Sequence, residues 1–214
     1  MQKYYPVPVF ILILILPFLF FGKPEIIPYL LEASVVVKTD LGTGSGVVFV
    51  RRDKCYIWTV SHVVNEAKEI WVIDNIGRHL IANLIINSRD EDIALLSIPN
   101  NSFSHGIEFN PYKSKIGDNI SHIGCPTGFE GMFSYFEGRI SFSHRMVENC
   151  SYDQVQCSAF YGCSGGGVFN SNGECIGLMA RFLNTNTHGM FLIVPSRRII
   201  EFAIKNNVNY AINI

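Results

Sequence analysis

The sequence has little net charge and none of the spacings that mark a metal site. Its 214 residues carry 17 Lys and Arg against 18 Asp and Glu, which gives a net charge of −1. Nucleic-acid-binding proteins usually present a basic face, so this balance argues against a nucleic-acid partner. No two cysteines form a C-x-x-C pair, and no His/Cys cluster has the spacing of a zinc site. We therefore expect neither a metal nor a cofactor.

Internal repeats and low-complexity tracts are also missing, but cysteine is not scarce. The six cysteines are an even number, which permits up to three disulfides. In an oxidising compartment some bridges are expected, and Cys150 and Cys157, close together in sequence, are one candidate pair. In a reducing cytosol all six stay thiols. The sequence leaves both alternatives open.

A single long hydrophobic run lies at the N-terminus, over Val7–Phe21. It is shorter than the about 20 residues that a comfortable membrane-spanning helix needs. No small-residue cleavage pattern follows it, which favours a signal-anchor over a cleaved signal peptide. Lys3 and Lys23 flank the run on both sides, so the positive-inside rule indicates no orientation. We predict that residues 1–24 form a hydrophobic signal-anchor or signal segment, and that the chain is membrane-anchored or exported.

The remaining residues, 25–214, read as short β-rich segments separated by turns, with "LIANLIINS" as one strand. Such segments, about 8 to 15 residues apart, are typical of β-barrels or sandwiches, and two groups of about six indicate two β halves. One helix is indicated after Pro195, over about 196–207, with Ser196 as its N-cap. Apolar residues at helical spacing place one face of it on the β body: Ile200, Ala203 and Ile204.

Three residues in separate segments have the chemistry of a nucleophilic site. His62 follows a predicted strand in "WTVSHVV", Asp92 begins another in "DIALLSI", and Ser164 stands in "GCSGGGVF". A serine hydroxyl is a weak nucleophile that needs an adjacent base, and a carboxylate must hold the tautomer of that base. Each residue alone has an ordinary structural explanation. In the order His, Asp, Ser, they indicate a catalytic triad.

Six segments occur in an order that resembles trypsin-like serine peptidases, and most closely the protease domain of the HtrA/Deg group. They are "GTGSGVVFV", "WTVSHVV", "DIALLSI", "HIGCPTG", "GCSGGGVF" and "CIGLMA". The resemblance implies an all-β fold of two six-stranded antiparallel β-barrels, about 30–112 and 113–195, followed by the helix. It places His62 and Asp92 on the first barrel, Ser164 on the second, and the active site between them. It also implies an oxyanion hole at the backbone of Gly162, Cys163 and Ser164.

The chain departs from the family pattern at several positions. Gly167 stands where proline usually follows S-G-G, and Cys163 stands where Asp or Asn usually precedes the serine. Val60 and Ser61 replace smaller residues before the histidine. No stretch resembles the PDZ domain of the HtrA/Deg group.

Cys163 is an alternative nucleophile, because viral relatives of this fold use cysteine in a G-x-C-G-G frame. That frame would need glycine at positions 161 and 164, where this chain has Tyr161 and Ser164. Ser164 itself stands correctly in G-x-S-G-G. The sequence therefore favours Ser164 as the nucleophile and assigns Cys163 a structural role.

The resemblance also predicts a primary substrate pocket, with Ser158 at its base and Ala180 and Phe182 along its wall. No acidic residue lies at the base, so Lys or Arg before the scissile bond is not favoured. We expect a preference for small or medium aliphatic residues at this position.

Together these features predict a serine endopeptidase that cleaves protein or peptide substrates through an acyl-enzyme. Two other interpretations stay open. One is a catalytically latent or inactive protease fold that binds peptides, and the other is a processing protease of narrow specificity. The oligomeric state is not legible in the sequence.

Overall fold

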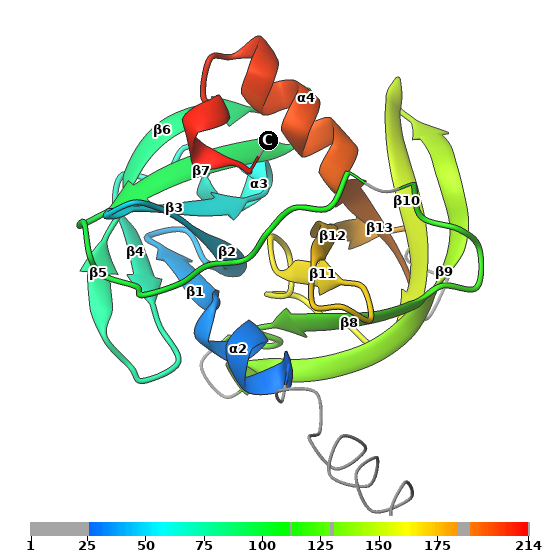
Figure 1. The fold of residues 1–214 in the computed structure, drawn as a ribbon, viewed down its shortest axis with the longest axis horizontal. Coiled ribbons are helices and arrows are strands. Elements are labelled where there is room, and N and C mark those ends of the chain that lie inside the picture. The colour runs from blue at the N-terminus through cyan, green and yellow to red at the C-terminus, as the bar shows by residue number, and fades with distance from the viewer. Residues whose placement is uncertain (1–25, 112, 129–130, 184–188, 214) are drawn as a thin grey trace, which may run out of the picture.

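Two β-sheets lie side by side and make up most of the molecule (Figure 1). The computed structural model describes residues 26–111, 113–128, 131–183 and 189–213. The predicted N-terminal segment, residues 1–24, lies outside these ranges. Within them, no helix has both the length and the apolar character needed to cross a membrane.

The first sheet has seven antiparallel strands in the order β5-β4-β1-β2-β3-β7-β6. Side chains two residues apart on a strand face the same side, and Val35, Val37, Val48 and Ile57 share one buried core. The strands are β1 (Ser34–Thr39), β2 (Thr43–Arg51), β3 (Lys54–Thr59), β4 (Ile70–Ile73), β5 (His79–Ile81), β6 (Asn83–Ser88) and β7 (Ile93–Ile98).

This sheet has one strand more than predicted, and it is open. The segment expected to be one strand divides at the buried residue Ala82, whose N–H donates to the carbonyl of Ile70. β5 before it pairs with β4, and β6 after it pairs with β7. The chain thus passes from one edge of the sheet to the other at Ala82, and no ladder joins the two edge strands in the described residues.

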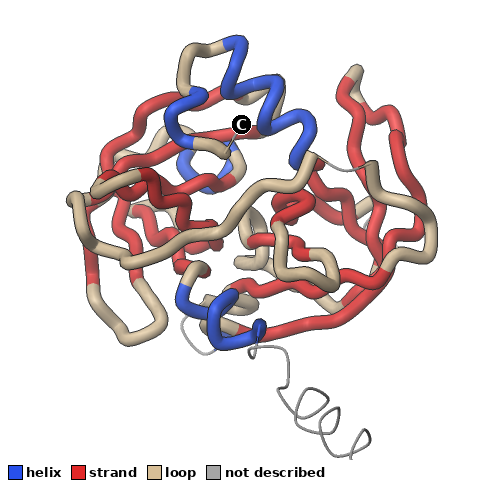
Figure 2. Tube along the Cα trace, in the orientation of Figure 1, coloured by secondary structure: helices blue, strands red, loops and turns tan. Residues whose placement is uncertain are grey.

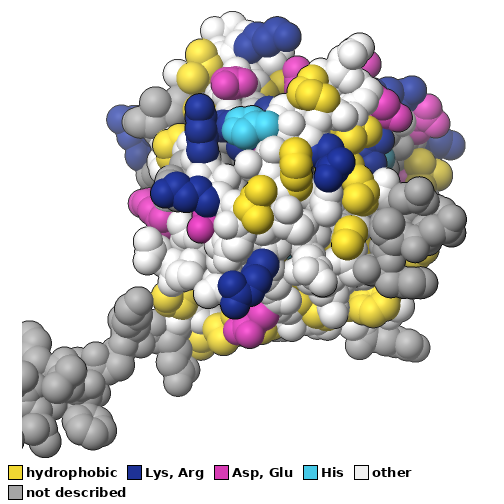
Figure 3. Space-filling model, turned by 90° about the vertical axis from the view of Figure 1, so that its right-hand side faces the viewer, with side chains coloured by type: hydrophobic (Ala, Val, Ile, Leu, Met, Phe, Trp, Pro, Cys, Tyr) yellow, Lys and Arg dark blue, Asp and Glu magenta, His cyan; other side chains and the backbone are white. Residues whose placement is uncertain are grey.

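The second sheet closes into a barrel with the order β10-β13-β12-β11-β8-β9. The predicted all-β class, with a six-stranded second barrel and a C-terminal helix, is confirmed. The strands are β8 (Asn119–Gly124), β9 (Ser134–Val147), β10 (Cys150–Cys157), β11 (Gly167–Phe169), β12 (Cys175–Phe182) and β13 (Met190–Pro195). On the side of the molecule drawn in Figure 3, hydrophobic side chains and both signs of charge are interspersed, and no single patch dominates the coloured surface.

Helices are few among the described residues, and the two longest lie on the outside of the sheets (Figure 2). They are α2 (Ile26–Glu32), which the sequence did not predict, the short α3 (Ser61–Val64), α4 (Ser196–Lys205) and the 3-10 turn η2 (Asn209–Ala211). One core cluster includes Trp58 and Leu95 of the first sheet, Val194 of the second and Phe202 of α4. The helix therefore helps to hold the two sheets together.

The predicted helix is present, but its cap and buried face differ from the prediction. Pro195 occupies the N-cap position, and the hydroxyl of Ser196 donates instead to the carbonyl of Asn110. The buried apolar residues are Ile199, Phe202 and Ala203, whereas Ile204 is exposed. The buried face is thus rotated from the predicted one by part of a turn.

A disulfide between Cys150 and Cys157 is excluded by their place in the fold. The two residues begin and end β10, and eight residues of extended strand hold their Cα atoms about 23 Å apart. All six cysteines, each within the described ranges, are free thiols in this structure.

Candidate active site

The pairing of β3 with β7 brings His62 and Asp92 together. Thr59 lies opposite Ala94 in this ladder, His62 follows three residues after Thr59, and Asp92 precedes Ala94 by two. The His62 Nδ1 lies 3.0 Å from Oδ1 and 3.1 Å from Oδ2 of Asp92, and the backbone N–H of His62 donates to Oδ1 at 3.1 Å. The carboxylate therefore fixes both the ring and the backbone of His62.

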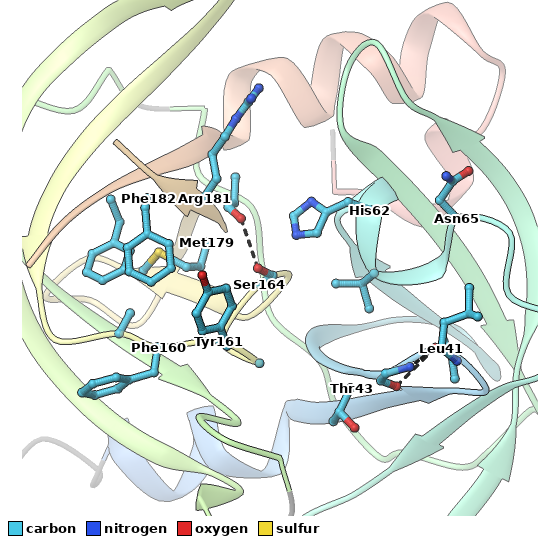
Figure 4. Close-up of a pocket in the computed structure, with 17 residues that line it drawn as sticks. Leu41, Thr43, His62, Asn65, Phe160, Tyr161, Ser164, Met179, Arg181 and Phe182 are labelled. Carbon is cyan, nitrogen blue, oxygen red and sulfur yellow. Dashed lines mark hydrogen bonds between the residues drawn. The ribbon is translucent and has the colours of Figure 1, made fainter. Parts of the chain in front are cut away.

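Ser164 approaches His62 from the second barrel, in the loop between β10 and β11. In Figure 4 the imidazole ring of His62 points toward Ser164 across the gap between the sheets. Both residues line one cleft with a volume of about 350 Å³. The Ser164 hydroxyl donates to the carbonyl of Ala180 at 3.1 Å. A rotation about its Cα–Cβ bond is therefore needed before His62 can accept its proton.

The backbone before Ser164 forms a turn that leaves two amides available. The N–H of Cys163 donates to the carbonyl of Phe160, and Gly162 has φ +97°, which suits glycine. Gly162 and Ser164 line the cleft, and their N–H groups have no hydrogen-bond partner among the described residues. Of the three predicted oxyanion-hole residues, these two thus retain a free donor, whereas the amide of Cys163 does not.

Cys163 has the surroundings of a structural thiol. Its residue exposure is only 1%, and it packs in the barrel core with Cys157, Val168 and Ile176. Burial raises the pKa of the Cys163 thiol above its usual value. A thiolate is the reactive form of cysteine, so the structure argues against Cys163 as the nucleophile.

The cleft contains an apolar pocket beside Ser164. Ala180 and Phe182, which the resemblance assigned to the pocket wall, line it, and Phe182 contacts the rings of Tyr161 and Phe191, with centroid distances of 5.4 and 4.9 Å. Ser158, predicted at its base, is exposed and does not line this pocket, whereas its buried neighbour Ala159 does. The side chains that line the cleft in the described residues include Arg181 and no carboxylate.

A second histidine is buried beneath the Ser164 loop. His122 has no exposed surface, its Nδ1 contacts the carbonyl of Gly167 at 2.9 Å, and its Nε2 has no partner among the described residues. Burial lowers the pKa of His122 to about 4, although the bond to Gly167 opposes the shift. The ring is therefore neutral at pH 7, with its proton on Nδ1.

This burial predicts a loss of stability in mild acid. The unfolded chain binds a proton near pH 6.5 and the folded chain only near pH 4, so the stabilising effect is present above pH 6.5 and lost as the pH falls toward 4. The shift corresponds to about 3 kcal/mol of unfolding free energy. Urea unfolding at several pH values is expected to show a shallower pH dependence for His122→Asn than for the native chain. Equal slopes would contradict this assignment.

Two residues outside the predicted site support the Ser164 loop. The N–H of Thr127 donates to the carbonyl of Tyr161 at 2.8 Å, and the hydroxyl of Ser45 donates to the carbonyl of Gly162 at 2.8 Å. Thr127 lies in "HIGCPTG" and Ser45 in "GTGSGVVFV", two of the six segments that resemble trypsin-like serine peptidases. Among the described residues, no three His, Cys, Asp or Glu side chains lie together as a metal site requires.

A family model and curated relatives point to the same family of peptidases. Residues 44–178 match a family model described as a trypsin-like peptidase domain. The chain is 36% identical over 163 residues to the periplasmic pH-dependent serine endoprotease DegQ of Escherichia coli, covering 72% of this chain and 35% of the relative. It is 29% identical over 169 residues to the serine protease Do-like HtrA of Lactobacillus helveticus, covering 73% and 41%. The chain thus spans about two fifths or less of the length of these relatives.

Solved structures agree on the fold. A serine endoprotease from Yersinia pestis superposes with a TM-score of 0.72 at 26% identity, over 88% of this chain and 68% of that one. A Mycobacterium tuberculosis protein crystallised in an inactive form gives a TM-score of 0.74 at 16% identity, over 88% and 93%. The second likeness concerns the fold alone.

Proposed function

Because this chain belongs to the trypsin-like peptidase family, we propose that it is a serine endopeptidase of the HtrA type that uses Ser164, His62 and Asp92 as its catalytic triad. The observation that carries the proposal is the contact of His62 Nδ1 with both oxygens of Asp92, at the cleft that Ser164 also lines. The substrates are protein or peptide segments, in keeping with the endoprotease names of its relatives.

The proposed reaction proceeds by two acyl transfers. Ser164 Oγ attacks the carbonyl carbon of the scissile bond while its proton passes to His62 Nε2, and Asp92 stabilises the imidazolium through Nδ1. The N–H groups of Gly162 and Ser164 donate to the oxyanion. The intermediate collapses as His62 protonates the leaving amine, which leaves an acyl-enzyme on Ser164. A water molecule, deprotonated by His62, then releases the acid and restores the serine.

A fluorophosphonate probe tests this proposal, since it labels an activated serine beside a formed oxyanion hole. We expect the full chain and Cys163→Ala to be labelled and Ser164→Ala not to be labelled. Loss of labelling in Cys163→Ala alone would assign the nucleophile to the cysteine. A folded native chain that takes no label but binds peptides would instead favour a latent or non-catalytic binding module.

We also propose that the chain acts outside the cytosol. The supporting observations are the apolar run Val7–Phe21 and the word periplasmic in the names of relatives. In this proposal the run serves as a signal-anchor or export signal. Fractionation of cells expressing the tagged chain tests it, and recovery of all the protein in the cytosol would contradict it.

Substrate preference follows from the apolar pocket. Phe182 narrows the pocket between Tyr161 and Phe191, and no carboxylate among the described lining residues favours a basic substrate side chain, so small or medium aliphatic residues should precede the cut. Replacing Phe182 by alanine removes a large ring and is expected to shift the preference at this position toward aromatic residues.

A peptide-library cleavage profile measures this shift. Phe142→Ala is the matched control, because Phe142 is exposed on β9 and does not line the cleft. Its profile should equal that of the native chain. A preference for Lys or Arg in the native chain would contradict the predicted specificity.

A further inference from the structure

Ser45 connects three segments of the molecule behind the Ser164 loop. It lies on β2 of the first sheet, and its residue exposure is 2%. Its hydroxyl accepts the N–H of Cys125 at 2.9 Å and donates to the carbonyl of Gly162 at 2.8 Å. Its own N–H donates to the carbonyl of Ser164 at 2.8 Å. One residue of the first sheet thus holds two positions of the loop that carries the proposed nucleophile.

The carbonyls of four consecutive residues in this loop are all held by hydrogen bonds. That of Tyr161 accepts the Thr127 N–H at 2.8 Å, that of Gly162 the Ser45 hydroxyl, that of Cys163 the Gly166 N–H at 3.0 Å, and that of Ser164 the Ser45 N–H. Only the bond to Gly162 comes from a side chain. It is therefore the one that a substitution can remove without changing the backbone.

The orientation of the Gly162–Cys163 peptide affects the two free N–H groups on either side of it, those of Gly162 and Ser164. The two free N–H groups belong to the Tyr161–Gly162 and Cys163–Ser164 peptides, and the Gly162–Cys163 peptide, whose carbonyl Ser45 holds, joins them. In a trans peptide the C=O and the N–H point in opposite directions, so the Ser45 bond also fixes the direction of the Cys163 N–H, which donates to the Phe160 carbonyl. Glycine accepts both signs of φ at little cost, so the turn is not fixed by Gly162 itself. The Ser45 hydroxyl supplies the constraint that the glycine lacks.

The geometry points to Ser45 as the positioning residue of the oxyanion hole, which its hydroxyl keeps open by holding the Gly162 carbonyl. This inference rests on the proposed function. It also gives the first sheet a direct role in the chemistry at Ser164, beyond supplying His62 and Asp92. Without the hydroxyl, the Gly162 carbonyl and the Cys125 N–H both lose a buried partner. The Gly162–Cys163 peptide is then held only through the Cys163 N–H, and its rotation changes the angle between the two free N–H groups on either side of it.

Ser45→Ala in the full chain tests the inference, with Ser34→Ala as a matched control. Ser34 has the same exposure of 2%, and its hydroxyl also donates to a backbone carbonyl, that of Leu30 at 2.7 Å, away from the cleft. Losing one oxyanion donor costs about 100- to 1000-fold in kcat in serine peptidases. Ser45→Ala leaves both oxyanion N–H groups in place but lets them be misoriented in part of the molecules. We therefore expect it to lower kcat by about 10- to 100-fold with KM nearly unchanged.

The kinetics use a peptide anilide with an aliphatic residue before the cut, with rates divided by the folded fraction from near-ultraviolet circular dichroism. Ser34→Ala should lose stability but keep the native kcat. Ser45→Thr retains the hydroxyl and should keep most of kcat, which gives a second comparison if Ser45→Ala does not fold. Equal kcat for the native chain, Ser34→Ala and Ser45→Ala would overturn the inference, as would a folded Ser45→Thr whose kcat is lost.

These outcomes are separate from failure of the proposed function. If the native chain neither cleaves the anilide nor takes the fluorophosphonate label, the proposed function fails before Ser45 is at issue. If the native chain is active and Ser45→Ala matches Ser34→Ala, only the role of Ser45 fails.

Discussion

Exchange of Asp92 for asparagine is expected to lower kcat at neutral pH by about four orders of magnitude, with KM little changed. In the structure both carboxylate oxygens lie within 3.1 Å of His62 Nδ1, and Oδ1 also accepts the backbone N–H of His62. An amide of the same shape preserves the packing, but its NH2 group favours the tautomer in which Nδ1 is an acceptor. His62 Nε2 then carries a proton and cannot accept the one from Ser164.

Asp90→Asn is the control for this experiment, because it makes the same chemical change two residues earlier at an exposed side chain. Steady-state hydrolysis of the peptide anilide gives kcat and KM for both variants. We expect Asp90→Asn to match the native chain. A similar kcat for the two variants, both folded, would show that the Asp92 contact does not support catalysis and would remove the basis for the triad.

The residues at the cleft were predictable because each belongs to a short motif with a chemical reason for its composition. His62 follows a strand, Asp92 precedes one, and Ser164 stands among glycines. The pairing of β3 with β7 then brings the first two together without further information. Local sequence was sufficient here, since the proposed chemistry needs particular residue types at particular places.

The buried face of α4 was not predictable in the same way. Ile200 and Ile204 have the spacing of a core face, yet Ile204 is exposed, while Ile199 and Phe202 are buried. Apolar residues surround much of this helix, so periodicity allows more than one face. The choice depends on where Trp58, Val194 and the other residues of the same core cluster leave space, and a single sequence does not give that information.

The pocket and the role of Ser45 depended on tertiary register. Ser158 and Ala159 are neighbours after the end of β10, and only the second lines the cleft. A shift by one residue in an extended segment reverses which side chain faces the pocket. The hydroxyl of Ser45 contacts a carbonyl 117 positions away in the sequence, and no local pattern around either residue indicates this contact.

Exchange of Gly165 for alanine is expected to cost at least about 3 kcal/mol of unfolding free energy, a large part of the stability of an ordinary domain. Gly165 has φ +86°, and a Cβ atom there would lie 2.1 Å from the Ser45 carbonyl oxygen and 2.2 Å from the Thr59 hydroxyl. Both atoms are held in place, because the Thr59 hydroxyl donates to that same carbonyl at 2.7 Å. The two sheets must separate at this point to admit a methyl group.

Gly77→Ala measures the free-energy cost of positive φ for alanine without the steric clash of a new Cβ atom. Gly77 has φ +83°, nearly the same as Gly165, but a Cβ atom there meets nothing within 4 Å. The left-handed conformation alone costs a side chain about 1 to 2 kcal/mol, so urea unfolding should show that loss for Gly77→Ala. The excess loss in Gly165→Ala then measures how closely the first sheet packs against the Ser164 loop. Equal losses in the two variants would mean that this contact yields easily, and that the loop is not held from behind as tightly as the role of Ser45 requires.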